Sequence, residues 1–85
     1  MTTDYKKHYT MINGHKFYLL DDCDALLCKL ENIFYDYCMD DNVSYEKVVE
    51  TEDEIKKLQN AINKNDVEVM QQMLNKYHTL FKRYR

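Results

Sequence analysis

The residues of this chain that are chemically reactive or able to bind a metal include three cysteines and three histidines. His8, His15, Cys23, Cys28 and Cys38 are thiols and imidazoles, which are the groups that zinc prefers as ligands. Structural zinc sites usually contain pairs of ligands two to four residues apart, a spacing that these residues lack. Cys23 and Cys28 lie five residues apart, which separates them by about 140° around a helix. We therefore expect buried free thiols, with no metal and no cofactor.

A cysteine paired with a histidine is also a common nucleophile in catalysis. Such enzymes surround the nucleophile with a characteristic turn or a glycine-rich oxyanion loop. This chain contains one glycine, Gly14, and the hairpin described below requires it. A phosphate-binding loop needs several glycines and is excluded for the same reason. The carboxylates occur in runs that are typical of solvated helix faces, so we expect no enzymatic activity.

The last ten residues of the chain combine cations with aromatic rings and contain no acid. Cations at this position also suit the negative end of a helix dipole. One functional interpretation is a partner-binding surface formed by Tyr77, Phe81, Lys82, Arg83, Tyr84 and Arg85. The same residues allow an alternative, binding of nucleic acid through cations and rings. A third possibility is that the helix near the amino terminus covers the rings, which would make them core.

Residues 45–63 and 66–84 are expected to form an antiparallel helical hairpin. Apolar residues recur at three- and four-residue steps in both segments, which is the helical period. Ser44 can cap a long first helix, although Thr51 and Glu54 form a capping box from which a shorter helix would start. Asn65 and Glu68 offer a second capping box after the turn. In the last helix the apolar stripe consists of Met70, Met73, Leu74, Tyr77, Phe81 and Tyr84.

Residues 8–20 are expected to form a β-hairpin, while residues 1–7 are polar and expected to be frayed. Asn13-Gly14 separates two runs rich in β-formers, and this dipeptide favours a type I′ turn because both positions need positive φ. The turn pairs Ile12 with His15 and Tyr9 with Tyr18. Two strands alone are marginally stable in water, so helices or a second copy must cover them.

Residues 22–39 are expected to form an acidic helix capped by Asp21-Asp22. Its apolar stripe consists of Leu26, Leu27, Leu30, Ile33, Phe34 and Tyr37, with Cys23 and Cys38 near its ends. The order of elements is therefore ββααα. This predicts one mainly helical α+β domain over residues 1–85.

Part of the helical hairpin resembles the helix pair of a single ankyrin repeat. The resemblance rests on Leu58-x-x-Ala61 followed by Glu68-Val69-Met70-x-x-Met73-Leu74. The Thr-Pro-Leu-His opening of such repeats is missing, and Tyr77 stands where the repeat ends its helix with glycine. Repeats also need stacked neighbours, and no second copy occurs. The resemblance implies a packed helical hairpin and carries no function.

The net charge of −3 is unevenly distributed along the chain. Residues 21–54 contain twelve acids against Lys29 and Lys47, whereas residues 55–85 contain seven Lys or Arg against Asp66 and Glu68. These blocks either attract each other within the fold or serve an intermolecular contact of one sign. The odd number of cysteines, with no signal peptide, predicts a reducing, cytoplasmic location.

Eight tyrosines and five methionines in 85 residues favour protein binding, because both types are common where proteins meet. We expect a small non-catalytic protein-binding module, with a possible homodimer and no membrane partner. The absence of proline and the abundance of Asn, Asp, Lys and Tyr resemble AT-rich coding. That composition is typical of many phage, viral and low-GC bacterial genes. We expect a phage- or virus-like accessory protein that inhibits or redirects a host protein. The alternative is a small nucleic-acid-binding regulator.

Overall fold

The fold consists of an amino-terminal β-hairpin followed by three helices, in a computed structural model that describes residues 9–81. Strands β1 (Tyr9–Ile12) and β2 (His15–Tyr18) precede helices α1 (Leu19–Met39), α2 (Tyr45–Lys64) and α3 (Val67–Tyr77). A short 3-10 helix, η2 (His78–Leu80), ends the described chain. The predicted mainly helical α+β class and its ββααα order are confirmed.

The hairpin has the predicted turn and register. Asn13 and Gly14 have φ of 51° and 83°, as a type I′ turn requires. Tyr9 pairs with Tyr18 and Ile12 with His15. The strands are shorter than residues 8–20, because α1 already begins at Leu19.

Helix α1 begins earlier than the predicted residue 22 because Tyr18 occupies its N-cap position. The Tyr18 backbone N–H donates to the carboxylate of Asp22 at 2.6 Å. Asp22 therefore caps the helix from inside the first turn, where a carboxylate also suits the helix dipole.

Helix α2 is the long helix, and the shorter alternative starting at Thr51 is wrong. The Ser44 hydroxyl oxygen accepts from the backbone N–H of Lys47 at the N-cap. Thr51 lies inside the helix, where its hydroxyl donates to the carbonyl of Lys47 at 2.9 Å. After α2, Asn65 adopts the left-handed conformation of a helix C-cap, and Asp66 rather than Asn65 caps α3.

Helix α3 ends at Tyr77, short of the predicted residue 84. The carbonyl oxygen of Asn75 lies 2.7 Å from Nδ1 of His78. Because that carbonyl can only accept, Nδ1 carries the proton. This contact lies at the point where the chain tightens into η2, and Phe81 then follows in extended backbone.

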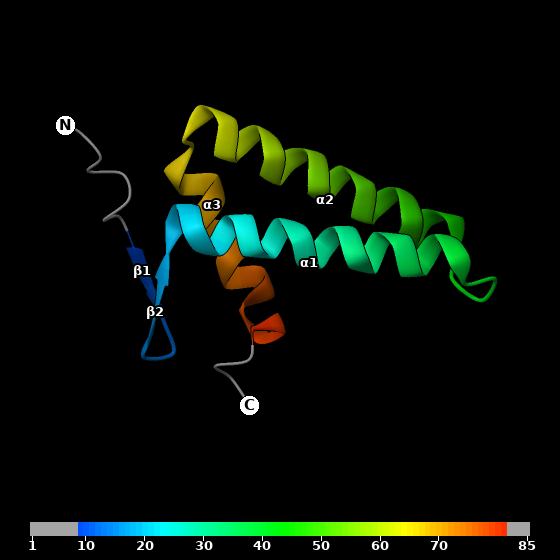
Figure 1. Ribbon diagram of the computed structural model, residues 1–85, viewed down its shortest axis with the longest axis horizontal. Coiled ribbons are helices and arrows are strands. Elements are labelled where there is room, and N and C mark those ends of the chain that lie inside the picture. Colours follow the sequence, from blue (N-terminus) through cyan, green and yellow to red (C-terminus); the bar gives the residue numbers. More distant parts are fainter. Residues whose placement is uncertain (1–8, 82–85) are drawn as a thin grey trace.

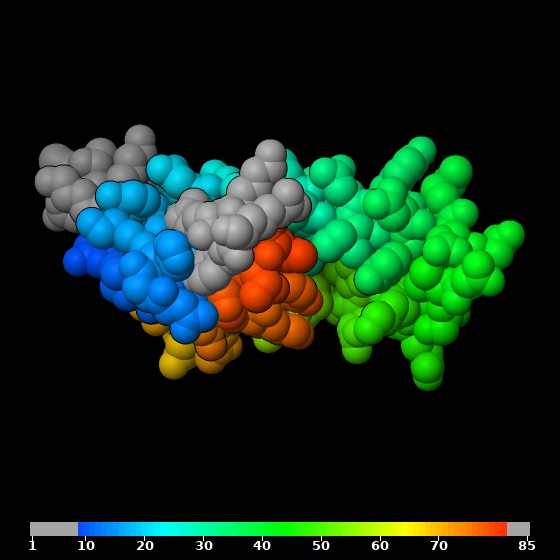
Figure 2. Space-filling model, turned by 90° about the horizontal axis from the view of Figure 1, so that it is seen from below, coloured from blue at the N-terminus to red at the C-terminus, as the bar shows by residue number. Residues whose placement is uncertain are grey.

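The core lies where the hairpin, α1 and α3 meet, with the end of α2 closing it. Figure 1 shows α1 and α2 side by side along their lengths and α3 crossing α1 near its start. In Figure 2, α3 and η2 lie beside the hairpin, and the end of the α1–α2 pair projects beyond them. The largest fully buried side chains are Phe17, Leu19, Leu26, Leu30, Leu58, Met70, Met73, Leu74 and Cys23.

The expectation of three buried cysteines holds for one of them. Cys23 is buried, and its thiol lies 3.8 Å from the carbonyl oxygen of Met70. Cys28 and Cys38 are exposed free thiols. Cys28 falls on the outer side of α1, and Cys38 lies in the last turn of α1, beyond the part that α3 covers.

Candidate protein-binding surfaces

Tyr77 joins α3 to α2 through a shared carboxylate. Its hydroxyl donates to Oε1 of Glu54 at 2.9 Å, and Nζ of Lys76 donates to the same oxygen at 2.7 Å. The side chain of Glu54 is only 15% exposed, whereas that of Lys76 is 57% exposed. Tyr77 was predicted from the sequence to bind a partner, and in the structure it holds two helices together.

The pKa values of this group suit a structural contact. Burial by itself raises the pKa of Glu54, but the hydrogen bonds from Lys76 and Tyr77 outweigh it and lower that pKa. Burial raises the pKa of Tyr77, and the bond to Glu54 raises it further. The hydrogen bond to Glu54 also raises the pKa of Lys76. At neutral pH the three groups are therefore held as carboxylate, phenol and ammonium.

Phe81, also predicted to bind a partner, belongs to the core. It is 5% exposed, and its ring packs edge-on against that of Phe17. Nζ of Lys29 lies 5.4 Å from the centroid of the Phe81 ring. The assignment of Phe81 to an association surface is corrected, because a ring buried in this way is inaccessible to a partner. The alternative that the ring is core applies to Phe81, but the ring that packs against it comes from the hairpin and not from the helix that follows, which contributes Lys29.

The other four predicted residues, Lys82, Arg83, Tyr84 and Arg85, lie outside the described residues. The structure therefore brings Tyr77 and Phe81 into the fold and leaves the rest of the predicted surface as a prediction.

One exposed apolar surface lies on the outer face of the hairpin, and we call Tyr9, Met11 and Tyr18 the hairpin surface. These side chains are 49%, 55% and 41% exposed. The two tyrosine rings meet edge-on with centroids 6.3 Å apart, and Nζ of Lys16 lies 4.6 Å from the centroid of Tyr9. The opposite face of the hairpin is buried against the helices, so this ribbon is solvent-exposed on one side only.

Three more exposed apolar side chains lie at the end of the α1–α2 pair, and we call Tyr35, Met39 and Tyr45 together the distal surface. These side chains are 66%, 71% and 80% exposed. Tyr35 and Met39 are four residues apart on α1, and Tyr45 begins α2. Tyr35 and Met39 fall outside the apolar stripe expected for residues 22–39. Tyr45 was expected to join the apolar stripe of the long helix capped by Ser44, and the structure exposes it instead. Their signal in the sequence is large apolar side chains at solvent-facing helix positions.

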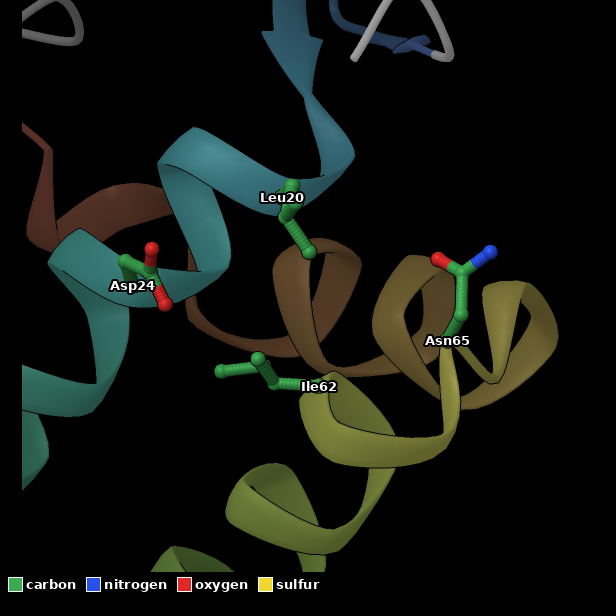
Figure 3. A pocket seen from close by; sticks show the side chains of 4 residues that line it. All are labelled: Leu20, Asp24, Ile62 and Asn65. Atoms are coloured by element: carbon green, nitrogen blue, oxygen red, sulfur yellow. The ribbon is translucent and has the colours of Figure 1, made fainter. Parts of the chain in front are cut away.

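A shallow furrow follows the contact between α1 and α2. One hollow, of about 370 Å³, lies between the start of α1 and the end of α2 and is lined by Leu20, Asp24, Ile62 and Asn65. In Figure 3, Leu20 and Ile62 point into it from the two helices. A neighbouring hollow of about 390 Å³ shares Asp24 and Ile62. The lining offers apolar contact and one carboxylate.

Over residues 9–81, no three His, Cys, Asp or Glu side chains lie together in a way that would hold a metal ion. Burial, followed by the charges of Asp22 and Asp24, raises the pKa of the Cys23 thiol to about 12. Cys23 is therefore a protonated thiol in the core at neutral pH.

None of the helices in the described part of the chain combines the length and apolarity that crossing a membrane would require. Comparisons with protein-family models, with curated proteins and with solved structures find no match to this chain.

Proposed function

We propose that this protein is a small non-catalytic protein-binding module. The observation that carries the proposal is the exposure of six large apolar side chains in two groups, the hairpin surface and the distal surface. Scattered single apolar residues are normal on a protein surface, whereas grouped ones mark interaction sites. All six are tyrosines or methionines, which are enriched in protein interfaces.

The shape of the molecule supports this proposal. Its extents are 47 × 30 × 16 Å, so the fold is flat and long. Figure 1 shows the hairpin at one end and the α1–α2 connection at the other. The two exposed surfaces are therefore separated along the long axis, which allows them to contact different parts of one partner or two different partners.

The partner is a protein that this module inhibits or redirects by occupying its surface. An accessory protein of a phage or virus is the setting that the composition favours, with the host cytoplasm as its location. A second copy is a further candidate for one of the two surfaces.

The test is affinity capture with the tagged full chain in an extract of the organism in which it acts. A hairpin variant (Tyr9→Ser, Met11→Ser, Tyr18→Ser) and a distal variant (Tyr35→Ser, Met39→Ser, Tyr45→Ser) serve as comparisons. Because these side chains are exposed, we expect both variants to stay folded by circular dichroism. Stoichiometric capture of one protein by the native chain, lost in at least one variant, supports the proposal. Equal capture by all three chains, or none by the native chain, contradicts it.

The alternative regulator would use the basic aromatic residues that end the chain. It predicts retention on heparin that falls steeply with added salt, because binding to a polyanion releases counterions. The excess of acids over the whole chain is unfavourable for this alternative.

A further inference from the structure

Among the described residues, no third element packs on the end of the α1–α2 pair, whereas α3 and η2 pack beside its other end. Figures 1 and 2 both show α3 and η2 beside the first half of α1, with the second half projecting past them. The distal surface lies on this projecting end. Half-buried Ile33, Phe34, Tyr37, Val48 and Val49 accompany it. Each helix here has one helical neighbour, which leaves apolar surface for a partner to bury.

A shallow hollow of about 410 Å³ lies on α2 at this end. Tyr45 and Val49 supply its apolar lining, and Glu46, Glu50 and Asp53 supply carboxylates around it. The hollow combines an apolar lining with an acidic rim, which suits an apolar side chain that has cationic neighbours.

The charge around this end has one dominant sign. We call the exposed acids of residues 36–53 the distal acids: Asp36, Asp40, Asp41, Glu46, Glu50, Glu52 and Asp53. Lys47 is the one cation in that range, and it lies 3.8 Å from Glu50 with both side chains largely exposed. Such an exposed pair contributes little stability. Among the described residues, the other ion pair joins Glu54 to Lys76. Within residues 9–81, Lys47 is therefore the one cation that forms an ion pair with a distal acid.

The placement of these acids conflicts with local helix stability. The last turn of α1 contains no cation, and Asp40 is its C-cap. Acids at this negative end of the helix dipole are unfavourable. A local conflict of this kind is typical of positions retained for function. The same charge repels a second copy and a nucleic acid, and it attracts a cationic protein surface.

We infer that Tyr45, the hollow beside it and the surrounding distal acids form a docking site for a cationic amphipathic segment of a partner protein. An apolar side chain of the segment enters the hollow, while its Lys or Arg side chains face the distal acids. This inference rests on the proposed function, because it names the chemistry of the partner and the end of the molecule that receives it.

The probe is a fluorescein-labelled Leu/Lys peptide with helical periodicity, and a Leu/Glu peptide of the same pattern is its control. Binding to the full chain is followed by fluorescence anisotropy at low and high ionic strength. One variant neutralises distal acids (Asp41→Asn, Glu46→Gln, Glu50→Gln). Its matched control neutralises three exposed acids elsewhere (Asp21→Asn, Asp24→Asn, Glu68→Gln), so both change the net charge from −3 to 0. A second pair compares Met39→Ser with Tyr45→Ser against Tyr9→Ser with Met11→Ser.

We expect the native chain to bind the Leu/Lys peptide and not the Leu/Glu peptide, more weakly at high salt. Both distal variants should lose at least about tenfold in affinity, the size of one lost charged or apolar contact of roughly 1.4 kcal/mol. Both control variants should bind as the native chain does.

Equal losses in the distal and control charge variants would mean attraction by net charge alone and would overturn the inference. Loss only in the hairpin control would also overturn it, while leaving the proposed protein-binding function in place. Sedimentation of the native chain as a dimer that the distal variants dissociate would assign this end to a second copy instead. Absence of peptide binding would overturn the inference, and the capture experiment would still decide the proposed function independently.

Discussion

The ring of Phe81 meets the ring of Phe17 edge-on, with centroids 5.2 Å apart and an angle of 88° between planes. Phe17 is on β2, and Phe81 follows η2 at the end of the described chain. The side-chain amide of Asn13 also lies 3.4 Å from Nε2 of His78. The hairpin is therefore closed against the helices by the far end of the chain.

Replacing Phe81 by Ala should destabilise the fold. Large-to-small changes of a buried Phe typically cost about 3–5 kcal/mol, and the edge-on contact with Phe17 is lost as well. The measurement is urea unfolding followed by circular dichroism. Tyr35→Ala is the matched control, because a 66% exposed ring should change stability by less than about 0.5 kcal/mol. A Phe81→Ala protein as stable as the native chain, but altered in its association state, would place this ring on an interface.

Gly14→Val should destabilise the hairpin through the backbone alone. Gly14 has φ of +83°, and a Cβ added there would have no neighbour within 4 Å. A β-branched residue at positive φ costs about 1–3 kcal/mol. Gly14→Asn is the control, because Asn tolerates this region and should cost less. Equal melting temperatures for Val and Asn variants would argue against strain at this turn.

The hairpin could be predicted because its signal is local. Asn13-Gly14 fixes the turn type, and the turn fixes the register, so no distant residue is needed. The same holds for Ser44, whose hydroxyl caps α2 through a contact three residues away. The start of α1 was placed too late because a carboxylate at Asp22 can cap from outside or inside a helix, and sequence pattern does not distinguish the two.

Tertiary contacts decide where α3 ends and whether the aromatic residues that follow its apolar stripe are buried. Tyr77 and Phe81 continue the helical period of Met70 and Met73, so periodicity extends the helix through them. The chain instead leaves the helix after Tyr77, and Phe81 reaches a strand more than sixty residues away in sequence. The distal surface was missed for a related reason. Whether Tyr35 is covered depends on where α3 crosses α1, which no local pattern specifies.

Glu54→Gln should weaken the fold at neutral pH and reduce its sensitivity to acid. The folded-state pKa of Glu54 is below its ordinary value, so its contribution is present above the unfolded pKa and is lost as pH falls through the folded pKa. We expect a loss of about 1 kcal/mol at pH 7, because one charged hydrogen-bond group is replaced and Lys76 is largely solvated. The difference should shrink as the pH falls below the ordinary range of glutamate.

Urea unfolding of both proteins between neutral and acidic pH measures this difference. Glu52→Gln on the same helix is the control, since Glu52 is exposed. The raised pKa values of Lys76 and Tyr77 predict a further loss at alkaline pH, as pH rises through those folded-state values. The free energy of unfolding of the native chain and that of the variant could instead differ by the same amount across the acidic range. That result would mean that the contact with Lys76 and Tyr77 does not lower the pKa of Glu54.

The three cysteines should differ sharply in their reaction with a thiol reagent such as DTNB. Cys28 and Cys38 are exposed, whereas Cys23 is buried with a pKa raised to about 12. Because the thiolate is the reactive form, the native protein should titrate two thiols promptly and the third only when unfolded. Cys28→Ser and Cys38→Ser should each remove one prompt equivalent without changing stability. Cys23→Ser should leave both prompt equivalents and lower the melting temperature, because a hydroxyl replaces a buried thiol. Three prompt equivalents in the native chain would contradict the burial of Cys23, and a melting curve shifted by chelator would contradict free thiols altogether.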